Sequence, residues 1–175
     1  TLEKAKIKFE YFVYEEANID KELLKKLDDK YVYAYVVMHS NPDSIINYLR
    51  ELNKPIIEVD PKVFHINGVT QIKFSNYNSM YYATQHLIDL GHKNIAFYGS
   101  DSHATSFRER HEGFLSCINA NKGINGYSII FDNKNGQYAD NQLLKKSLIE
   151  HQITGLICAN DIIALGAYKD IKELH

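Results

Sequence analysis

Two stretches of this chain decide its fold: GHKNIAFYGSDSHATSFRERHEGF at residues 91–114 and GLICANDIIALGAY at residues 155–168. Each begins with a short apolar segment typical of a buried strand, continues with small and polar residues, and ends in an amphipathic helical pattern. In an open α/β sheet, ligands bind outside the carboxyl ends of the strands, where backbone N–H groups and helix N-termini converge. The two stretches therefore predict a pocket for a small polar molecule.

The composition predicts a soluble, cytoplasmic α/β protein. A chain of 175 residues with 45% apolar content can bury the core of one ordinary domain or of two small lobes. The net charge of -2 and the dispersed lysines argue against a nucleic-acid-binding surface in this segment. Cys117 and Cys158 lie in apolar segments, which is typical of buried, reduced thiols. No apolar run approaches the roughly 18 residues that cross a bilayer, so no membrane partner is expected.

Strand and helix patterns alternate along the chain, which predicts parallel sheets with right-handed crossovers. The apolar run at residues 32–38 suits a strand that is buried on both faces. The expected strands are residues 7–14, 32–38, 56–59, 71–74, 94–98, 127–131 and 155–158. The expected helices are residues 20–29, a helix opened by Asn41-Pro42 with a stripe of Ile45, Ile46, Leu49 and Leu52, and residues 78–90, 106–120, 137–150 and 161–174.

These motifs resemble the effector-binding core of the LacI/GalR family of bacterial transcription regulators. The resemblance rests on several stretches that occur in the family's order and with family-like spacing. It covers most of the chain from about residue 32 onward, and more weakly the first thirty residues. The matching stretches are KPIIEVD at 54–60, FSNYNSMYYATQHLIDLGH at 74–92, GHKNIAFYGS at 91–100, SFRERHEGF at 106–114 and CANDIIALGA at 158–167.

The resemblance implies a two-lobe fold like that of type I periplasmic binding proteins, with parallel Rossmann-like sheets. The N-terminal lobe is expected to hold residues 1–74 and the C-terminal lobe residues 75–175, with a crossing at residues 74–76. Both lobes are expected to be incomplete, because the family places a further strand between those at 7–14 and 32–38 and continues after residue 174. We therefore expect a longer polypeptide, or strands supplied by another copy.

Arg108 lies near the start of a helix, where its planar guanidinium suits two vicinal hydroxyls or a carboxylate. From spacing alone, an i,i+4 ion pair with Glu112 is the simpler interpretation. The resemblance implies instead that Arg108, the first arginine of S-x-R-x-R, contacts the effector. Arg110 falls elsewhere on the helix, and we expect it to face solvent or the other lobe.

Asn160 and Asp161 lie where a strand ends and the next helix begins. Either residue could cap the helix. The Asn160 amide offers both a donor and an acceptor, which fits a sugar hydroxyl. The resemblance implies that Asn160 contacts the effector, which leaves Asp161 as the cap.

Three further effector contacts are expected from the resemblance: Ser102 in the loop after residues 94–98, Asp60 at the end of IIEVD, and Phe74 at the crossing. Ordinary loop polarity would also explain Ser102. An aromatic residue such as Phe74 is more often part of a core than a platform for a ligand. A stacking aromatic position of the family falls at Phe131 or Asn133.

No pattern in the sequence indicates an enzyme. A G-x-S-x-G elbow, a Walker loop and a dinucleotide glycine fingerprint are missing from the sequence. The histidines and cysteines lack metal-ligand spacing. We therefore expect no catalytic residue, no metal and no cofactor.

The resemblance implies the ligand-sensing portion of a transcription regulator. Its expected partners are a small, sugar-like effector bound between the lobes, a second copy of the chain in a homodimer, and operator DNA bound only through a headpiece that is not in this chain. An extracellular sugar-binding protein of a transport system shares the fold and is the alternative. The sequence does not identify the effector.

Overall fold

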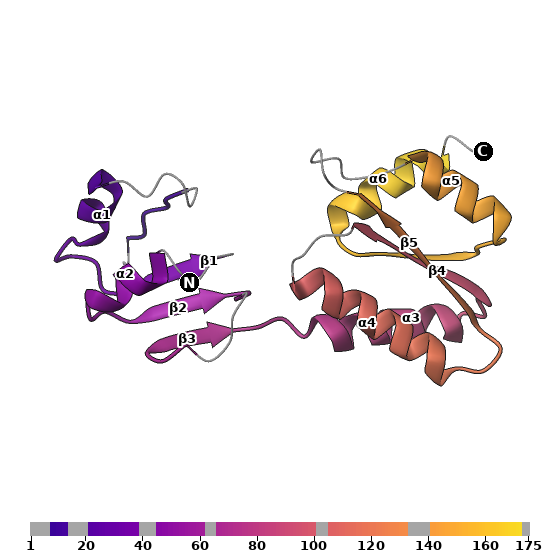
Figure 1. Ribbon diagram of the computed structural model, residues 1–175, viewed down its shortest axis with the longest axis horizontal. Coiled ribbons are helices and arrows are strands. Elements are labelled where there is room, and N and C mark those ends of the chain that lie inside the picture. The colour runs from indigo at the N-terminus through magenta and orange to yellow at the C-terminus, as the bar shows by residue number, and fades with distance from the viewer. Residues whose placement is uncertain are drawn as a thin grey trace. The chain divides into compact units, whose positions relative to one another are not determined.

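The computed structural model describes residues 8–13, 21–38, 45–61, 66–100, 105–132 and 141–172. The chain divides into two compact units, Thr1–Lys73 and Phe74–His175. Each unit has a parallel three-stranded sheet and a hydrophobic core of its own (Figure 1). The fold is therefore α/β with parallel sheets, as predicted.

The first unit has a sheet of order β1-β2-β3. Its elements are α1 (Lys21–Leu27), β1 (Tyr35–Met38), α2 (Ile45–Glu51), β2 (Ile56–Val59) and β3 (Val69–Ile72). The strands pair in parallel, with Tyr35 opposite Ile56 and Ile56 opposite Val69. The predicted stripe of α2 is confirmed, because Ile45, Ile46 and Leu49 are buried against this sheet. The strand predicted at residues 71–74 begins two residues earlier, at Val69.

The strand predicted at residues 32–38 is present as β1, but the prediction that it is buried on both faces is wrong. Along β1, Tyr35 and Val37 are each 7% exposed, whereas Val36 is 65% and Met38 58% exposed. Successive side chains of a strand point to opposite faces of the sheet. Among the described residues, only the face with Tyr35 and Val37 is covered, and α1 and α2 supply the cover.

The strand predicted at residues 7–14 is also not found. Residues 8–13 form no regular element, and their side chains are exposed, including those of Phe9, Tyr11 and Val13. The pairing partner of β1 is β2, and residues 8–13 do not pair with it. Alternating apolar residues suit a strand, but a strand also needs a neighbour for its backbone N–H and C=O groups. Residues 7 and 14 lie outside the described residues.

The second unit has a sheet of order β5-β4-β6, with all strands parallel. Figure 1 shows α3 and α4 on one face of this sheet and α5 and α6 on the other. The elements are α3 (Asn76–Asp89), β4 (Asn94–Ser100), α4 (Thr105–Ala120), β5 (Asn125–Phe131), α5 (Asn141–Glu150), β6 (Gly155–Cys158) and α6 (Asp161–Lys172). Each predicted strand and helix of this unit is present.

The central strand β4 explains why this unit is the better packed of the two. It pairs with β5 on one side and β6 on the other, and residues Ile95 to Ser100 are all buried. Parallel strands with helices on both faces are expected to be continuous apolar runs of this kind. The carboxyl ends of β4 and β6 therefore lie side by side, and α6 begins just after the end of β6.

The helices α3 and α4 approach each other closely at Gly113. A Cβ atom added at this position would lie 2.2 Å from the backbone carbonyl oxygen of Tyr77. Only a residue without a side chain fits there, because a backbone carbonyl, unlike a flexible side chain, cannot rotate away. Gly113 is therefore required by packing rather than by backbone conformation.

Replacing Gly113 by Ala tests this contact. The added methyl group forces α3 and α4 apart, and we expect the free energy of unfolding to fall by about 1–3 kcal/mol or more. Denaturant titration measures the change. Asn119→Ala at an exposed position of the same helix is the control, and its effect should be neutral or slightly stabilising because Ala favours helices. A Gly113→Ala variant as stable as the control would show that the helices are not in close contact.

Candidate functional site

The candidate site lies at the carboxyl ends of β4 and β6 in the second unit. This edge of a parallel sheet is where small ligands bind in open α/β folds. The first turns of α4 and α6 and the start of α3 contribute its polar side chains. They form a network that the sequence predicted only in part.

Arg110 is the centre of this network. Its Nε donates a hydrogen bond to Oδ1 of Asn76 at 3.0 Å, and its Nη1 donates one to the carbonyl oxygen of Ala159 at 2.6 Å. The side chain is partly buried, and both partners belong to the second unit. The prediction that Arg110 faces solvent or the other lobe is therefore wrong. Arg110 instead ties the start of α3 to the turn between β6 and α6.

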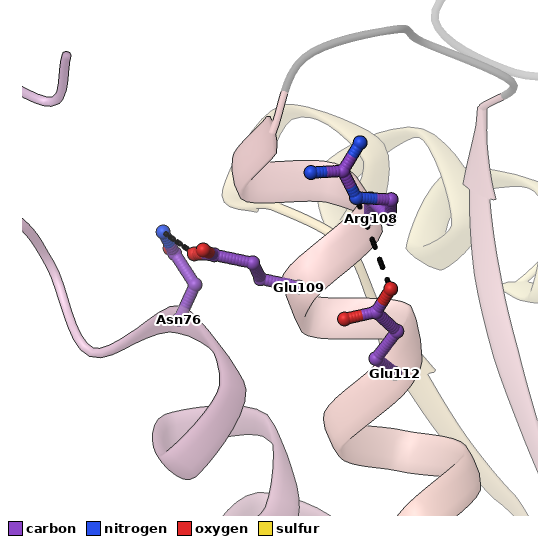
Figure 2. A network of polar contacts seen from close by, with 4 residues as sticks. All are labelled: Asn76, Arg108, Glu109 and Glu112. Atoms are coloured by element: carbon purple, nitrogen blue, oxygen red, sulfur yellow. Dashed lines mark hydrogen bonds and ion pairs between the residues drawn. The ribbon is translucent and has the colours of Figure 1, made fainter. Parts of the chain in front are cut away.

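Asn76 is the first residue of α3 and is only 4% exposed. Its Oδ1 accepts from Arg110, and its Nδ2 donates to Oε2 of Glu109 at 3.2 Å. Figure 2 shows Glu109 pointing from α4 toward Asn76. Both ends of the buried amide are therefore hydrogen-bonded, as a buried polar group requires.

Arg108 lies on a different side of α4. Its Nε is 3.8 Å from Oε1 of Glu112, and the two side chains are 65% and 55% exposed (Figure 2). The i,i+4 ion pair expected from spacing is therefore present. An ion pair this exposed to solvent contributes little interaction energy. The guanidinium remains available to another anion or hydroxyl.

Asn160 caps α6. Its side-chain Oδ1 accepts a hydrogen bond from the backbone N–H of Ile163 at 2.9 Å, three residues into the helix. Asp161 bonds only its immediate neighbour, since its Oδ1 accepts from the N–H of Ile162 at 3.1 Å. The assignment of the cap to Asp161 is therefore wrong, because the preceding residue occupies the capping position.

The remaining predicted contacts belong to different parts of the chain. Asp60 lies in the first unit, has a positive φ of 55°, and donates its N–H to the carbonyl oxygen of Ile72 at 2.9 Å. Phe74, at the start of the second unit, is largely exposed. Phe131 is buried in the core and packs against Tyr98, with ring centroids 5.1 Å apart. Ser102 and Asn133 lie outside the described residues.

His111 lies on the sheet-facing side of α4. Its ring stacks on Phe97 with centroids 4.9 Å apart, and its Nε2 is 2.7 Å from Oγ of Ser128. Burial lowers the pKa of His111 from the ordinary value of 6.5, and the nearby Glu112 carboxylate opposes that change. The ring therefore packs as a neutral aromatic group against the central strand.

Neither cysteine of the chain forms a disulfide. Burial raises the pKa of the Cys117 thiol, and it raises the pKa of Cys158 to about 11. Among the described residues, no group of histidine, cysteine and acidic side chains is arranged to hold a metal ion. The described helices include none that is long and apolar enough to cross a bilayer.

Arg110 and Asn76 are the site residues that sequence reasoning missed. The sequence does contain a pattern that predicts an inward-facing Arg110. This residue shares a helical stripe with Phe107, Phe114 and Cys117, which all pack inward. An arginine on an inward-facing stripe needs buried acceptors. For Asn76, the sequence contains no comparable local signal, since its partners are more than thirty residues away.

Comparison with known proteins places this site in context. Residues 84–175 match the family model of the periplasmic binding protein-like domain. A transcriptional repressor PurR of Haemophilus influenzae strain PittEE is 34% identical over 102 residues, which is 56% of this chain and 30% of the relative. The PurR repressor of Histophilus somni strain 2336 is 32% identical over 123 residues, 68% of this chain and 36% of the relative. The chain thus spans about a third of the curated relatives it matches.

Solved structures share the fold at lower identity. A LacI family transcriptional regulator from Enterococcus faecium with bound ribose superposes with a TM-score of 0.68 at 22% identity, covering 87% of this chain and 57% of that one. GanP, a glucose-galactose binding protein from Geobacillus stearothermophilus, gives a TM-score of 0.70 at 19% identity, covering 99% of this chain and 65% of that one. Both likenesses support the periplasmic-binding-protein-like fold.

Arg110→Leu tests whether the network stabilises the second unit. The substitution leaves Oδ1 of Asn76 and the carbonyl oxygen of Ala159 without their donor, and we expect it to lower the free energy of unfolding by about 2–4 kcal/mol. Arg108→Leu on the same helix is the matched control and should change it by less than about 0.5 kcal/mol. Equal effects in denaturant titration would contradict the assignment of Arg110 to the network.

The lowered pKa of His111 predicts that the stability of the protein depends on pH. In the unfolded chain a histidine takes up its proton near its ordinary pKa, whereas folded His111 does so only at lower pH. The unfolded state therefore binds more protons, and the protein should lose stability as the pH falls from about 7 to about 5. His111→Gln should reduce this loss, and His86→Gln at an exposed position of α3 should not. Denaturation curves across this range with the same slope for wild type and His111→Gln would refute the prediction.

Proposed function

We propose that this chain is the ligand-sensing portion of a bacterial transcription regulator. The chain belongs to the periplasmic binding protein-like domain family, and it resembles the effector-binding domain of LacI/GalR regulators. The observation that carries the proposal is the match of residues 84–175 to the family, together with a repressor that is 34% identical over 102 residues. The polar network at the carboxyl edge of the second sheet supports it, because sensing requires a binding site rather than a reactive group.

The proposed effector is a small polar molecule, a sugar or sugar derivative, bound between the two lobes. Ribose is bound in a structural neighbour that is a regulator of the LacI family. Asn160 supports this chemistry, because its Oδ1 caps α6 while its Nδ2 makes no hydrogen bond within the described residues. Arg108 has a guanidinium that is exposed and only weakly paired. Sugar hydroxyl oxygens accept hydrogen bonds from such donors.

The full set of proposed effector contacts is Arg108, Asn160, Ser102, Asp60 and Phe74. We assign Arg110 a different role in the same site. Its hydrogen bond to the carbonyl oxygen of Ala159 holds the turn that carries Asn160. In this arrangement Arg110 positions the turn, and Arg108 and Asn160 contact the effector.

We propose that the effector acts by favouring one relative arrangement of the two lobes. A ligand shifts such an equilibrium only by the difference between its affinities for the two states. In a cytoplasmic homodimer, this shift would change how operator DNA is held by a separate headpiece. This chain has a net charge of -2 and is not proposed to contact DNA itself.

A sugar-binding protein of a transport system is the second candidate. It is favoured by the likeness to GanP, which covers 99% of this chain. The two candidates differ in one measurable property, since only a regulator changes its affinity for operator DNA when the effector binds. An enzyme is not proposed, because the relatives are transcriptional repressors.

Arg108→Ala in the intact protein tests the proposed site. The loss of charged hydrogen bonds should weaken effector binding by about 1.5–3 kcal/mol. Isothermal titration calorimetry with ribose, glucose and galactose as probes measures the affinity, and the sugar that wild type binds is then used for the variants. Arg50→Ala, at an exposed position of α2, is the matched control and should bind as wild type does.

Unchanged affinity of Arg108→Ala for the sugar that wild type binds would refute the role of Arg108. Binding of none of these sugars by wild type would refute the sugar class. Operator binding that is indifferent to the bound sugar would favour the transport protein over the regulator.

A further inference from the structure

The chain contains the tripeptide Ile-Asn-Gly twice, at residues 66–68 and at residues 124–126. An asparagine followed by glycine can react with the backbone of its own chain, because glycine has no side chain to shield its nitrogen atom. Both asparagines and both glycines are exposed to solvent. The local sequence and the exposure are therefore alike at the two sites, and the fold is what distinguishes them.

The first copy lies in an open turn before β3. The N–H of Val69 donates a hydrogen bond to the carbonyl oxygen of Ile66 at 3.2 Å, and Gly68, with a φ of 78°, occupies the third position of this β-turn. A positive φ at that position is typical of a type II turn. A Cβ atom added at Gly68 would meet nothing within 4 Å beyond the adjacent residues. Within the described residues, the side chain of Asn67 and the N–H of Gly68 make no hydrogen bond.

The second copy lies in β5 and is held on several sides. The backbone N–H of Asn125 donates to the carbonyl oxygen of Lys93 at 2.8 Å, and its Nδ2 donates to Oδ1 of Asn94 at 2.8 Å. Gly126 is paired with β4, and a Cβ atom added to it would lie 2.7 Å from the side chain of Ile118. The side chain and the backbone of Asn125 must therefore give up these partners before they can react.

We propose that Asn67 is a site of spontaneous deamidation in the folded protein, whereas Asn125 is protected by its strand. The backbone nitrogen of Gly68 attacks Cγ of Asn67, and the new C–N bond closes a five-membered succinimide ring. The side-chain nitrogen leaves as ammonia with the proton from the Gly68 nitrogen. Water then opens the ring at either carbonyl and gives aspartate or isoaspartate. Water is the only other reactant, so the reaction needs neither an effector nor a partner.

Isoaspartate changes both the backbone and the charge of the turn. Its main chain runs through the former side chain, which inserts an additional methylene group directly before β3. Ile66 and Val69 pack against the hydrophobic core of the first unit, and the hydrogen bond between them closes the turn. The product therefore disturbs the edge of this core, and it adds a negative charge to a chain whose net charge is -2.

Site-resolved peptide mapping of the full chain tests the proposal. The protein is incubated at mildly alkaline pH, and samples taken over time are digested and analysed by tandem mass spectrometry. In the folded protein Asn67 should deamidate at least about tenfold faster than Asn125, because a protected group reacts only when its segment opens. In denaturant the two rates should agree to within about threefold, because the tripeptides are identical and the strand no longer protects Asn125.

Two matched variants test the chemistry. Methylation of the digested peptides by a protein isoaspartyl methyltransferase measures isoaspartate. Asn67→Gln should remove this signal from the peptide that contains the turn, because the longer side chain would have to close a six-membered ring. Asn125→Gln should leave the same signal unchanged. A further Asn-Gly pair, at residues 135–136, lies outside the described residues, and mapping reports its peptide separately.

Three outcomes would contradict the proposal. Equal rates at Asn67 and Asn125 in the folded protein would overturn it directly. A difference that persists in denaturant would also overturn it, because the fold would then not be the cause. Conversion of Asn67 to aspartate without any isoaspartate would exclude the succinimide ring.

Discussion

The candidate site depends on one steric constraint, the close approach of α3 and α4 at Gly113. Because this residue has no side chain, the backbone of Tyr77 packs directly against α4. The adjacent Asn76 is thereby brought to Arg110, which lies one turn earlier on the same helix. The guanidinium can then reach across to Ala159 at the end of β6. A packing contact between two helices thus determines where the turn before α6 is held.

Most of the second unit could be predicted from the sequence, because its strands and helices obey local rules. The continuous apolar run of β4 is buried on both faces, as such a run suggests, and the helical stripes face the sheet. In the first unit the same rules predicted α2 and β2 but failed for two other segments. Residues 8–13 and 32–38 have patterns that suit strands, but a pattern states only which side chains can be buried. Whether a neighbouring strand or a covering helix is present is decided by distant parts of the chain.

The site could be predicted less well, and the reasons are physical. Both Asn160 and Asp161 are good caps, and the choice between them depends on where the helix begins, which sequence patterns predict only to within a few residues. Arg108 and Arg110 differ by two positions, or about 200° around a helix, so they face nearly opposite ways. The inward stripe of α4 identifies Arg110 as the buried one. Its partner Asn76 comes from another helix, and such a pairing follows only from the packing.

Cys158 lies at the end of β6, two residues before Asn160, and its raised pKa has a consequence for the site. Thiolate, and not thiol, is the form that reacts with oxidants and electrophiles. With a pKa of about 11, only about one Cys158 side chain in ten thousand is ionised at pH 7. Cys158 is therefore slow to react with oxidants at this edge of the sheet. For the sensor proposed above, this means that ligand binding near Asn160 does not depend on the redox state of the Cys158 thiol.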